Sequence, residues 1–249
     1  MSMFDRDFLA HLRSLGYEGV RQETDYIVGM AIFYKTTKFK LEWTESRSRA
    51  MMVGLTMEVS VEVGEGAEAT MSPLSVMVCT VHLEGKADET AKRFTQVKSL
   101  LKRCEARLPK GVKPQEAMVF ICGDFNSSED GGAVRLLEDG ELGPEFREYD
   151  IQVTPTHFRH PFRFVNAYPI DQRYLTFITS FSISTIDHIF SPLGLVDTVG
   201  VLSFTPGELE EMKQTMLPNV THSSDHLPVG AVFQLNSRLM ELLRGKVLR

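Results

Sequence analysis

The segment from Val53 to Val63 alternates strictly between apolar residues and small or polar residues. Its odd positions are all apolar, whereas its even positions are Gly, Thr, Glu, Ser and Glu. Successive side chains of a β-strand point to opposite faces of the sheet, so this pattern predicts a strand with one buried face. A second apolar run extends from Leu74 to Leu83 and predicts an antiparallel partner for the first strand. The chain is therefore expected to contain a hairpin of two long strands.

The other predicted elements mix helices and strands without strict βα alternation. Apolar residues at helical spacing, with a capping-box spacing at 127–130, predict helices over residues 4–15, 88–108 and 131–140. The first of these helices is expected to bury Phe4, Phe8, Leu12 and Leu15. Short apolar runs predict strands over residues 27–34, 117–122, 183–190, 197–204 and 228–235. This pattern favours an α/β fold, a sandwich of two mixed β-sheets flanked by helices, over a Rossmann fold or a barrel.

The composition fits one domain. In a chain of 249 residues with 43% hydrophobic content, one large core can form. We assign residues 1–236 to this domain and residues 237–249 to a C-terminal helical tail. No apolar stretch reaches the roughly 18 residues of a membrane span, and no basic segment followed by an apolar core opens the chain, so we expect no membrane association.

The three cysteines are an odd number, and two of them lie in apolar runs, where they resemble small buried hydrophobic residues. This usage favours a reducing compartment. We therefore expect an intracellular protein. The cytoplasm is the preferred compartment, and the nucleus and the mitochondrion are the alternatives.

The charge distribution points to one local basic segment. The net charge of −6 argues against broad attraction to polyphosphate chains. Residues 151–186, however, contain three arginines and only one acidic residue, and aromatic residues interleave with the arginines. Such aromatics could stack on bases, although they more often belong to a core. The predicted substrate contacts are Arg159, Arg163 and Arg173.

A carboxylate and an amide follow the predicted strand 117–122. Asp124 and Asn126 are two residues apart, so in an extended backbone they point to the same side. The carboxylate could bind a hard cation or position a water, and the amide could donate to a phosphate oxygen. An Asx turn that closes the strand is the alternative interpretation.

Other strand ends carry titratable groups as well. His82 ends the strand 74–83, and Asp225-His226 stands where a polar loop meets an apolar run, which places a metal ligand and a base at a rim. Asp187 lies in an otherwise apolar strand, where an unpaired carboxylate is costly, so we expect a histidine partner, and His226 could be that partner. His188 points to the opposite face and is expected to be structural.

Four motifs in this order resemble those of the endonuclease/exonuclease/phosphatase superfamily. They are His82-Leu83, Gly123-Asp124-Phe125-Asn126, Ile186-Asp187-His188-Ile189 and Ser224-Asp225-His226-Leu227-Pro228. Further segments resemble the branch of nocturnin, Angel and carbon-catabolite-repressor deadenylases, namely Ala31-Ile32-Phe33-Tyr34-Lys35, Arg93-Phe94-Thr95-Gln96-Val97 and Leu217-Pro218-Asn219. The resemblance extends from about residue 4 to residue 235.

This resemblance implies a Mg²⁺-dependent phosphodiesterase, with Mn²⁺ as an alternative metal. It implies that Asp225 helps to hold the metal, and the predicted metal ligands are Asp225, Asp124 and Asn126. The implied substrate is RNA, attacked by a 3′–5′ exoribonuclease of the deadenylase type at a poly(A)-like 3′ end. Protein partners are not indicated.

The resemblance also implies roles for the other residues. His226, oriented by Asp187, would contact the scissile phosphate or transfer a proton. Asp124 would position or deprotonate the attacking water. Asn126 and His82 would hold phosphate oxygens.

One feature of such enzymes has no counterpart in this sequence. They use a metal-binding Glu in a Gln-Glu motif that, judged by the match of Leu15-Gly16-Tyr17, would fall just before Met1. We therefore expect an N-terminally incomplete fold that lacks the first strands, and Gln22-Glu23 is a decoy because it follows the first helix. Two alternatives stay open: a catalytically impaired RNA-binding or scaffold domain, and the same chemistry on DNA, a sphingolipid or an inositol phosphate.

Overall fold

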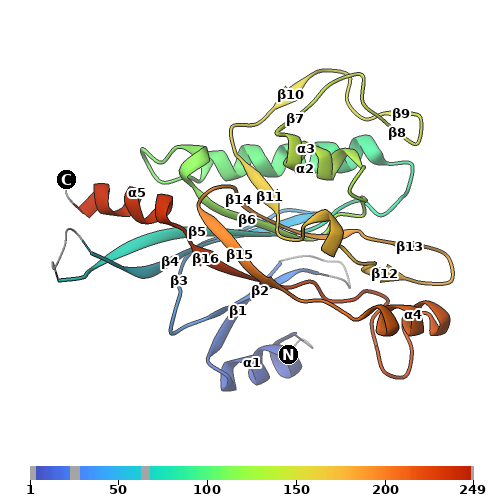
Figure 1. Ribbon diagram of the computed structural model, residues 1–249, viewed down its shortest axis with the longest axis horizontal. Coiled ribbons are helices and arrows are strands. Elements are labelled where there is room, and N and C mark those ends of the chain that lie inside the picture. Colours follow the sequence, from blue (N-terminus) through green and yellow to red (C-terminus); the bar gives the residue numbers. More distant parts are fainter. Residues whose placement is uncertain (1–3, 23–28, 63–67, 248–249) are drawn as a thin grey trace.

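The computed structural model describes residues 4–22, 29–62 and 68–247. Within these ranges the chain forms three layers (Figure 1), with helices on one face of a central sheet and paired strands on the other. This arrangement confirms the predicted α/β sandwich. Glu23 of the Gln22-Glu23 pair, residues 27 and 28 of the predicted strand 27–34, and Val63 lie outside the described residues.

The central sheet has six strands in the order β11-β14-β6-β5-β4-β3. Their bounds are β3 Lys40–Ser46, β4 Ala50–Val61, β5 Thr70–His82, β6 Met118–Asp124, β11 Phe164–Asn166 and β14 Asp187–Pro192. Only β5 and β6 run parallel, so the sheet is mixed. The predicted hairpin is confirmed, since β4 and β5 pair antiparallel from Ala50 opposite Val81 to Val61 opposite Thr70.

Two helices cover one face of this sheet. They are α2, Thr90–Ala106, which confirms the long predicted helix, and α3, Gly132–Asp139. The stripe of α2, including Phe94, Val97 and Leu101, packs on strand residues such as Cys79 and Ile121 in a core that excludes solvent. The buried Cys79 and Cys104 thiols lie 3.6 Å apart between β5 and α2, as expected of small hydrophobic residues.

The opposite face is covered by two antiparallel strand pairs and the last helix. The pairs are β1 Tyr17–Arg21 with β2 Ala31–Lys35, and β15 Val196–Val201 with β16 Ala231–Leu235. The helix α5, Ser237–Val247, buries Leu239 and Leu243 in the same core as the odd-numbered residues of β4. The helical segment after residue 236 therefore packs on the domain, and the boundary drawn there stays a prediction.

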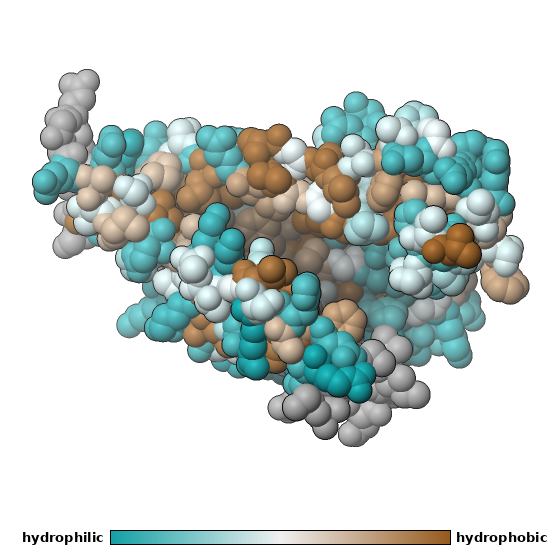
Figure 2. All heavy atoms as spheres, turned by 90° about the horizontal axis from the view of Figure 1, so that it is seen from below, coloured by the Kyte–Doolittle hydropathy of each residue, from teal (hydrophilic) through white to brown (hydrophobic). Residues whose placement is uncertain are grey.

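The side of these strand pairs is not fully covered. Seen from below, the molecule has a hollow bordered by apolar side chains (Figure 2). On β15 and β16, Val199 and Val232 are exposed.

The shorter elements that complete the fold are α4 Pro206–Thr215, β7 Glu141–Leu142, β8 Arg147–Glu148, β9 Ile151–Gln152, β10 Phe158–Arg159, β12 Phe177–Ile178 and β13 Ile183–Ser184. Across the described ranges, no helix has the length and apolar character to cross a membrane.

The first helix differs from its prediction in the face that it buries. A π-helical turn, Phe4–Leu9, precedes α1, Ala10–Ser14. It buries Leu9 and leaves Phe8 and Leu15 exposed, so the predicted stripe is wrong for these two residues, whereas Phe4 and Leu12 are half-buried. A π-turn holds more residues than an α-turn and therefore rotates the following side chains out of the expected register.

The start of α3 also differs. The capping-box spacing at 127–130 does not cap this helix, which begins after Gly131 without a side-chain cap at that position. Instead, the backbone N–H of Gly132 donates to the carboxylate of Glu148 at 2.6 Å. A carboxylate from a distant segment thus satisfies the helix N-terminus and stabilises its dipole.

One close contact in the sheet predicts a measurable cost. A Cβ at Gly54 on β4 would lie 2.1 Å from the ring nitrogen of Trp43 on β3, so Gly54→Ala should displace this indole. We expect the free energy of unfolding to fall by about 1–3 kcal/mol, as in other overpacked cores. Urea unfolding measures the change. The control Gly207→Ala meets open space in α4 and should be neutral or slightly stabilising, and equal stability of both variants would contradict the prediction.

Candidate active site

Three neighbouring strands place polar side chains in one row at the same end of the central sheet, where the strands begin or end. The parallel pairing of β5 and β6 sets His82 opposite Asp124. The antiparallel pairing of β6 and β14 sets Asp187 opposite Asp124 on the other side. Three of the predicted site residues therefore lie side by side where β5 and β6 end and β14 begins.

His226 joins this row from a distant part of the chain. Its Nδ1 lies 2.8 Å from Oδ2 of Asp187, and because a carboxylate only accepts, Nδ1 carries the proton and donates it. Its Nε2 lies 4.0 Å from Oδ2 of Asp124. The predicted contact between His226 and Asp187 is therefore present in the structure.

This contact sets the protonation of His226. The hydrogen bond to Asp187 raises the pKa of His226 above its ordinary value, against the lowering effect of burial, and the charges of Asp187, Asp124 and Asp225 raise it further. The imidazole is thereby favoured in its cationic form, which can donate to a phosphate oxygen.

Asp124 is fixed by its own turn. The backbone N–H of Asn126 donates to Oδ1 of Asp124 at 2.7 Å, and the Asn126 amide donates to Oδ2 at 3.2 Å and to the carbonyl of Leu83 at 3.1 Å. Nε2 of His82 lies 3.6 Å from Oδ2. The Asx turn considered from the sequence is thus present, and it holds the carboxylate at the strand edge. The Asn126 amide is directed to protein groups, and its contact with a phosphate stays a prediction.

The surroundings of Asp124 shift its pKa in the direction useful to a base. Burial raises the pKa of Asp124 above its ordinary value, while the N–H of Asn126 opposes the shift; the charge of Asp187 raises it further and the two histidines lower it. A carboxylate with a raised pKa accepts a proton from water more readily.

The backbone of this turn has strict requirements. Gly123 has a φ of +129°, and a Cβ there would lie 2.2 Å from the Val81 carbonyl of the paired strand. Asn126 has a left-handed φ of +46°, which asparagine tolerates better than most residues. The Gly-Asp-Phe-Asn sequence therefore fits the geometry at both of its ends.

Beneath the turn, His188 is buried and supports it. Its Nε2 lies 3.0 Å from the Ser127 carbonyl, and its Nδ1 lies 3.3 Å from the Asn166 amide. Because the carbonyl only accepts, Nε2 carries the proton and Nδ1 accepts from Asn166. Burial lowers the pKa of His188 to about 4, so the ring is neutral. The contact of His188 with Ser127 and the contribution of Asn166 have no signal in the sequence.

A buried ion pair connects the loops that follow β5 and β6. The Arg93 guanidinium donates to the carbonyls of Glu84, Lys86 and Ala87, in the loop after His82. It also pairs at 3.0 Å with Glu148, the residue that caps α3. The Arg93 side chain thus fixes the path of the chain next to the site.

Asp225, the predicted metal ligand, is exposed. Its carbonyl accepts from the N–H of Ile178, which anchors the segment. Within the described part of the chain, no group of three or more His, Cys, Asp or Glu side chains is arranged to hold a metal ion. The oxygen donors of Asp124, Asn126 and Asp225 are nevertheless of the type that Mg²⁺ prefers.

The three predicted substrate arginines lie in different surroundings, and of these Arg173 lines a small pocket together with Asp187 and His188. Arg173 is largely buried and pairs with Glu129 at 2.8 Å and Glu138 at 2.7 Å. Arg159 on β10 pairs with Glu141 at 2.9 Å. Arg163 is exposed. The basic segment therefore does not form one surface, because nearby glutamates from other elements engage two of its arginines.

Most aromatic residues of the same segment belong to the core, the more common of the two roles considered, and Phe181 is an exposed exception. Those that are buried are Phe162, Phe164, Tyr168 and Tyr174. Tyr168 also donates from its hydroxyl to the carbonyls of Leu202 and Gly230. These four rings are therefore not accessible for stacking on a base.

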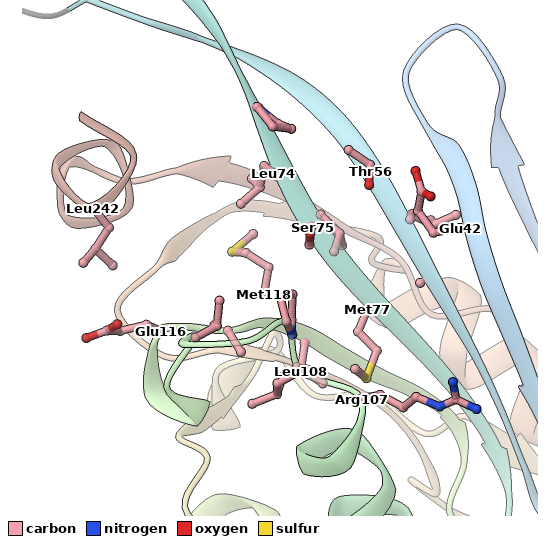
Figure 3. A pocket seen from close by; sticks show the side chains of 18 of the residues that line it. Glu42, Thr56, Leu74, Ser75, Met77, Arg107, Leu108, Glu116, Met118 and Leu242 are labelled. Atoms are coloured by element: carbon pink, nitrogen blue, oxygen red, sulfur yellow. The ribbon is translucent and has the colours of Figure 1, made fainter. Parts of the chain in front are cut away.

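A cavity of about 480 Å³ lies elsewhere, between the start of β5, the end of α2 and α5. Figure 3 shows Met77, Met118 and Leu242 around it, with Arg107 and Glu42 at its rim. Neither the candidate catalytic residues nor their direct partners line this cavity. It therefore belongs to a different part of the molecule.

The Endonuclease/Exonuclease/phosphatase family profile matches residues 5–226. The chain belongs to this family. Among curated relatives, the CCR4-Not complex 3′-5′-exoribonuclease subunit Ccr4 of Mycosarcoma maydis is 24% identical over 287 residues, covering 94% of this chain and 42% of the relative. The CCR4-NOT transcription complex subunit 6-like-A of Xenopus laevis is 23% identical over 299 residues, covering 96% and 54%. The chain thus spans about half the length of these relatives.

Solved structures of the family share the fold. ANGEL2, described as a 2′,3′-cyclic phosphatase and bound to adenosine-2′,3′-vanadate, superimposes with a TM-score of 0.69 at 22% identity, covering 94% of this chain and 79% of ANGEL2. The human nocturnin catalytic domain with bound sulfate gives a TM-score of 0.63 at 15% identity, with coverage of 94% and 78%. The resemblance to the nocturnin, Angel and Ccr4 branch is thereby confirmed.

The Asp187–His226 contact predicts a pH-dependent effect of Asp187→Asn. Loss of the carboxylate should lower the pKa of His226, because the hydrogen bond to Asp187 is the largest cause that raises it, and NMR titration of the imidazole measures the change. Because the wild-type pKa is raised above 6.5, the contact stabilises the fold below pH 6.5, and this contribution is lost as the pH rises through the raised value.

The loss of stability in Asp187→Asn should therefore be larger at low pH than at high pH. As a control, Asp197→Asn changes an exposed carboxylate on β15 and should leave the titration of His226 unchanged. An identical His226 titration in Asp187→Asn and wild type would contradict the assignment.

Proposed function

We propose that this chain is a Mg²⁺-dependent phosphodiesterase that removes nucleotides from the 3′ end of RNA, with poly(A)-like ends as its substrate. The row of His82, Asp124 and Asp187 with His226 is the observation that carries the proposal. A curated relative described as a 3′-5′-exoribonuclease and a structural neighbour bound to an adenosine vanadate support the choice of substrate.

The side chains can divide the proton transfers between them. A water oxygen attacks the scissile phosphorus and the P–O3′ bond breaks, which releases a nucleoside 5′-monophosphate. Asp124 accepts the proton of the water, and its raised pKa favours this role. His226, held by Asp187, donates a proton toward the leaving O3′ or a phosphate oxygen. His82 stands next to Asp124 and can bind a second phosphate oxygen.

Mg²⁺, or Mn²⁺ in its place, would be held by Asp225 with Asp124 and the amide oxygen of Asn126. Bound there, it would stabilise the charge that grows on the phosphoryl group. Mg²⁺ is often held by one or two carboxylates and completed by water and substrate phosphates. Two carboxylates and one amide therefore fit a metal that is bound weakly until the substrate arrives.

An exposed phenylalanine supports a nucleic-acid substrate. Phe181 is 97% exposed at the turn between β12 and β13. The same hairpin contacts the site, because the Phe177 ring lies 4.9 Å from the His226 ring and the N–H of Ile178 donates to Asp225. An exposed aromatic ring on a hairpin that contacts the site offers a stacking surface for a base.

A second candidate is an RNA-binding or scaffold domain without turnover. The observation that favours it is that the described residues supply no cluster of three or more acidic or imidazole metal ligands. Such a domain would bind oligo(A) without cleaving it. Hydrolysis of sphingolipid, inositol phosphate, DNA and cyclic phosphate substrates is compared with hydrolysis of oligo(A) under the same conditions.

Cleavage of 5′-labelled oligo(A) in Mg²⁺ tests the proposal. We expect the wild type to shorten the RNA from its 3′ end and Asp124→Ala to lose about 10²–10⁴-fold in rate, since the proton acceptor is removed. Asp197→Ala on β15 is the matched control and should retain wild-type activity. Cleavage that persists unchanged in Asp124→Ala would refute the site, and binding without any cleavage by the wild type would favour the second candidate.

Truncation of Phe181 tests the base-stacking role. Phe181→Ala should lower kcat/KM for oligo(A) by about 5- to 150-fold, the equivalent of 1–3 kcal/mol for one stacked base. Hydrolysis of bis(p-nitrophenyl) phosphate, which has no base, should not change. Phe8→Ala, which removes another exposed ring, is the control. An equal loss on both substrates would show that Phe181 acts on the fold of the site and not on the base.

A further inference from the structure

A second pocket, of about 480 Å³, lies between the β3–β4 turn and α2, and all charged residues that line it are arginines. They are Arg47 and Arg49 from the turn and Arg103 from α2. Among the described residues no Asp or Glu lines it, although the chain carries a net charge of −6. We propose that this pocket binds a backbone phosphate of the RNA substrate upstream of the scissile bond, an inference that rests on the proposed function.

The positive charge around the pocket exceeds what its two acidic neighbours can neutralise, since Glu84 is shared by Arg49 and Lys92. The Glu45 carboxylate, outside the pocket, is shared by Arg47 at 3.0 Å, Arg103 at 3.7 Å and Arg107 at 2.8 Å. One carboxylate cannot neutralise three guanidinium groups. About half of each Arg47 and Arg103 side chain also remains exposed, so both can turn N–H groups toward an incoming phosphate.

The walls of the pocket add neutral donors, and its floor adds none. Gln96 and Ser99 on α2 line it together with the serines of the turn. The floor is formed by the buried, apolar side chains of Met52 and Leu100. The hydrogen-bond donors for a ligand therefore lie at the rim, where arginines and hydroxyl groups can bind a phosphate. The sugar attached to that phosphate can rest on the apolar floor.

The pocket adjoins the candidate catalytic row. The backbone N–H of His82 donates to the carbonyl of Arg49 at 3.2 Å, so the pocket wall and the row meet at the end of β5. Arg49 itself reaches Glu84, two residues after His82, at 3.5 Å. An RNA strand with its 3′ end at Asp124 can thus extend past His82 and place an upstream phosphate among the arginines.

This surface replaces the basic segment that the sequence indicated. Arg159 pairs with Glu141 and Arg173 with two glutamates, whereas Arg47 and Arg103 share one carboxylate with Arg107. In the sequence, Arg47 and Arg49 lie in the short turn Ser46-Arg47-Ser48-Arg49, which directly follows Glu45. Only the packing of this turn beside α2 brings in Arg103. The basic character of the pocket is therefore a property of the fold.

Binding of fluorescein-labelled oligo(A) without metal, followed by fluorescence anisotropy, tests the pocket apart from catalysis. In Arg47→Ala/Arg103→Ala we expect the Kd to rise at least 10-fold. The slope of log K against log salt should become shallower by about 0.7, since one phosphate contact of a single strand contributes about this amount. Arg135→Ala is the matched control, because Arg135 is 39% exposed and paired with Asp139 on α3, and it should bind like the wild type.

A second variant tests the pocket in case the double alanine variant does not fold. Ser99→Glu adds a carboxylate at an exposed position of the rim without removing an ion pair, and it should weaken binding as well. Wild-type affinity and salt slope in both variants, or no binding of oligo(A) by the wild type, would overturn the pocket. Reduced binding in both variants would support it even if the wild type cleaved no RNA, so that a failure of the proposed activity stays distinguishable from a failure of the pocket.

Discussion

The strand register at the end of the central sheet is the constraint on which the candidate site depends. His82, Asp124 and Asp187 are neighbours only because β5 pairs with β6 in parallel and β6 pairs with β14 in antiparallel register. A shift of one residue in either pairing would turn a side chain to the opposite face of the sheet. Such a shift would also turn core residues of these strands, such as Val81, Ile121 and Phe190, away from α2, so the hydrophobic core also determines the chemistry at the strand ends.

The row also creates the electrostatic conditions that hydrolysis would need. Burial raises the pKa of Asp124, and the hydrogen bond to Asp187 raises the pKa of His226, so the two groups favour a base and a cationic donor next to each other. Opposite charges on the two groups stabilise each other at 4.0 Å. The neutral His188 beneath them adds no charge that would disturb this balance.

Much of this arrangement could be predicted from the sequence, because the information is local. The alternation in β4, the stripe of α2 and the motifs at strand ends each lie in one short segment, and the Asp187–His226 contact follows from the cost of an unpaired carboxylate. Contacts between distant segments for which neither residue carries such a signal could not be predicted. The glutamates that engage Arg173, the Glu148 cap of α3 and the meeting of Arg47 with Arg103 arise only when separate elements pack together.

The buried Arg93–Glu148 pair illustrates how such long-range contacts serve the site. A buried ion pair adds little net stability, because desolvation offsets most of the attraction. This pair, however, binds the carbonyls of the loop after His82 through Arg93 and the first turn of α3 through Glu148. The loop that leaves β5 and the start of α3, which follows the turn after β6, are thus tied to one ion pair. Its role is therefore better understood as positioning than as stabilisation.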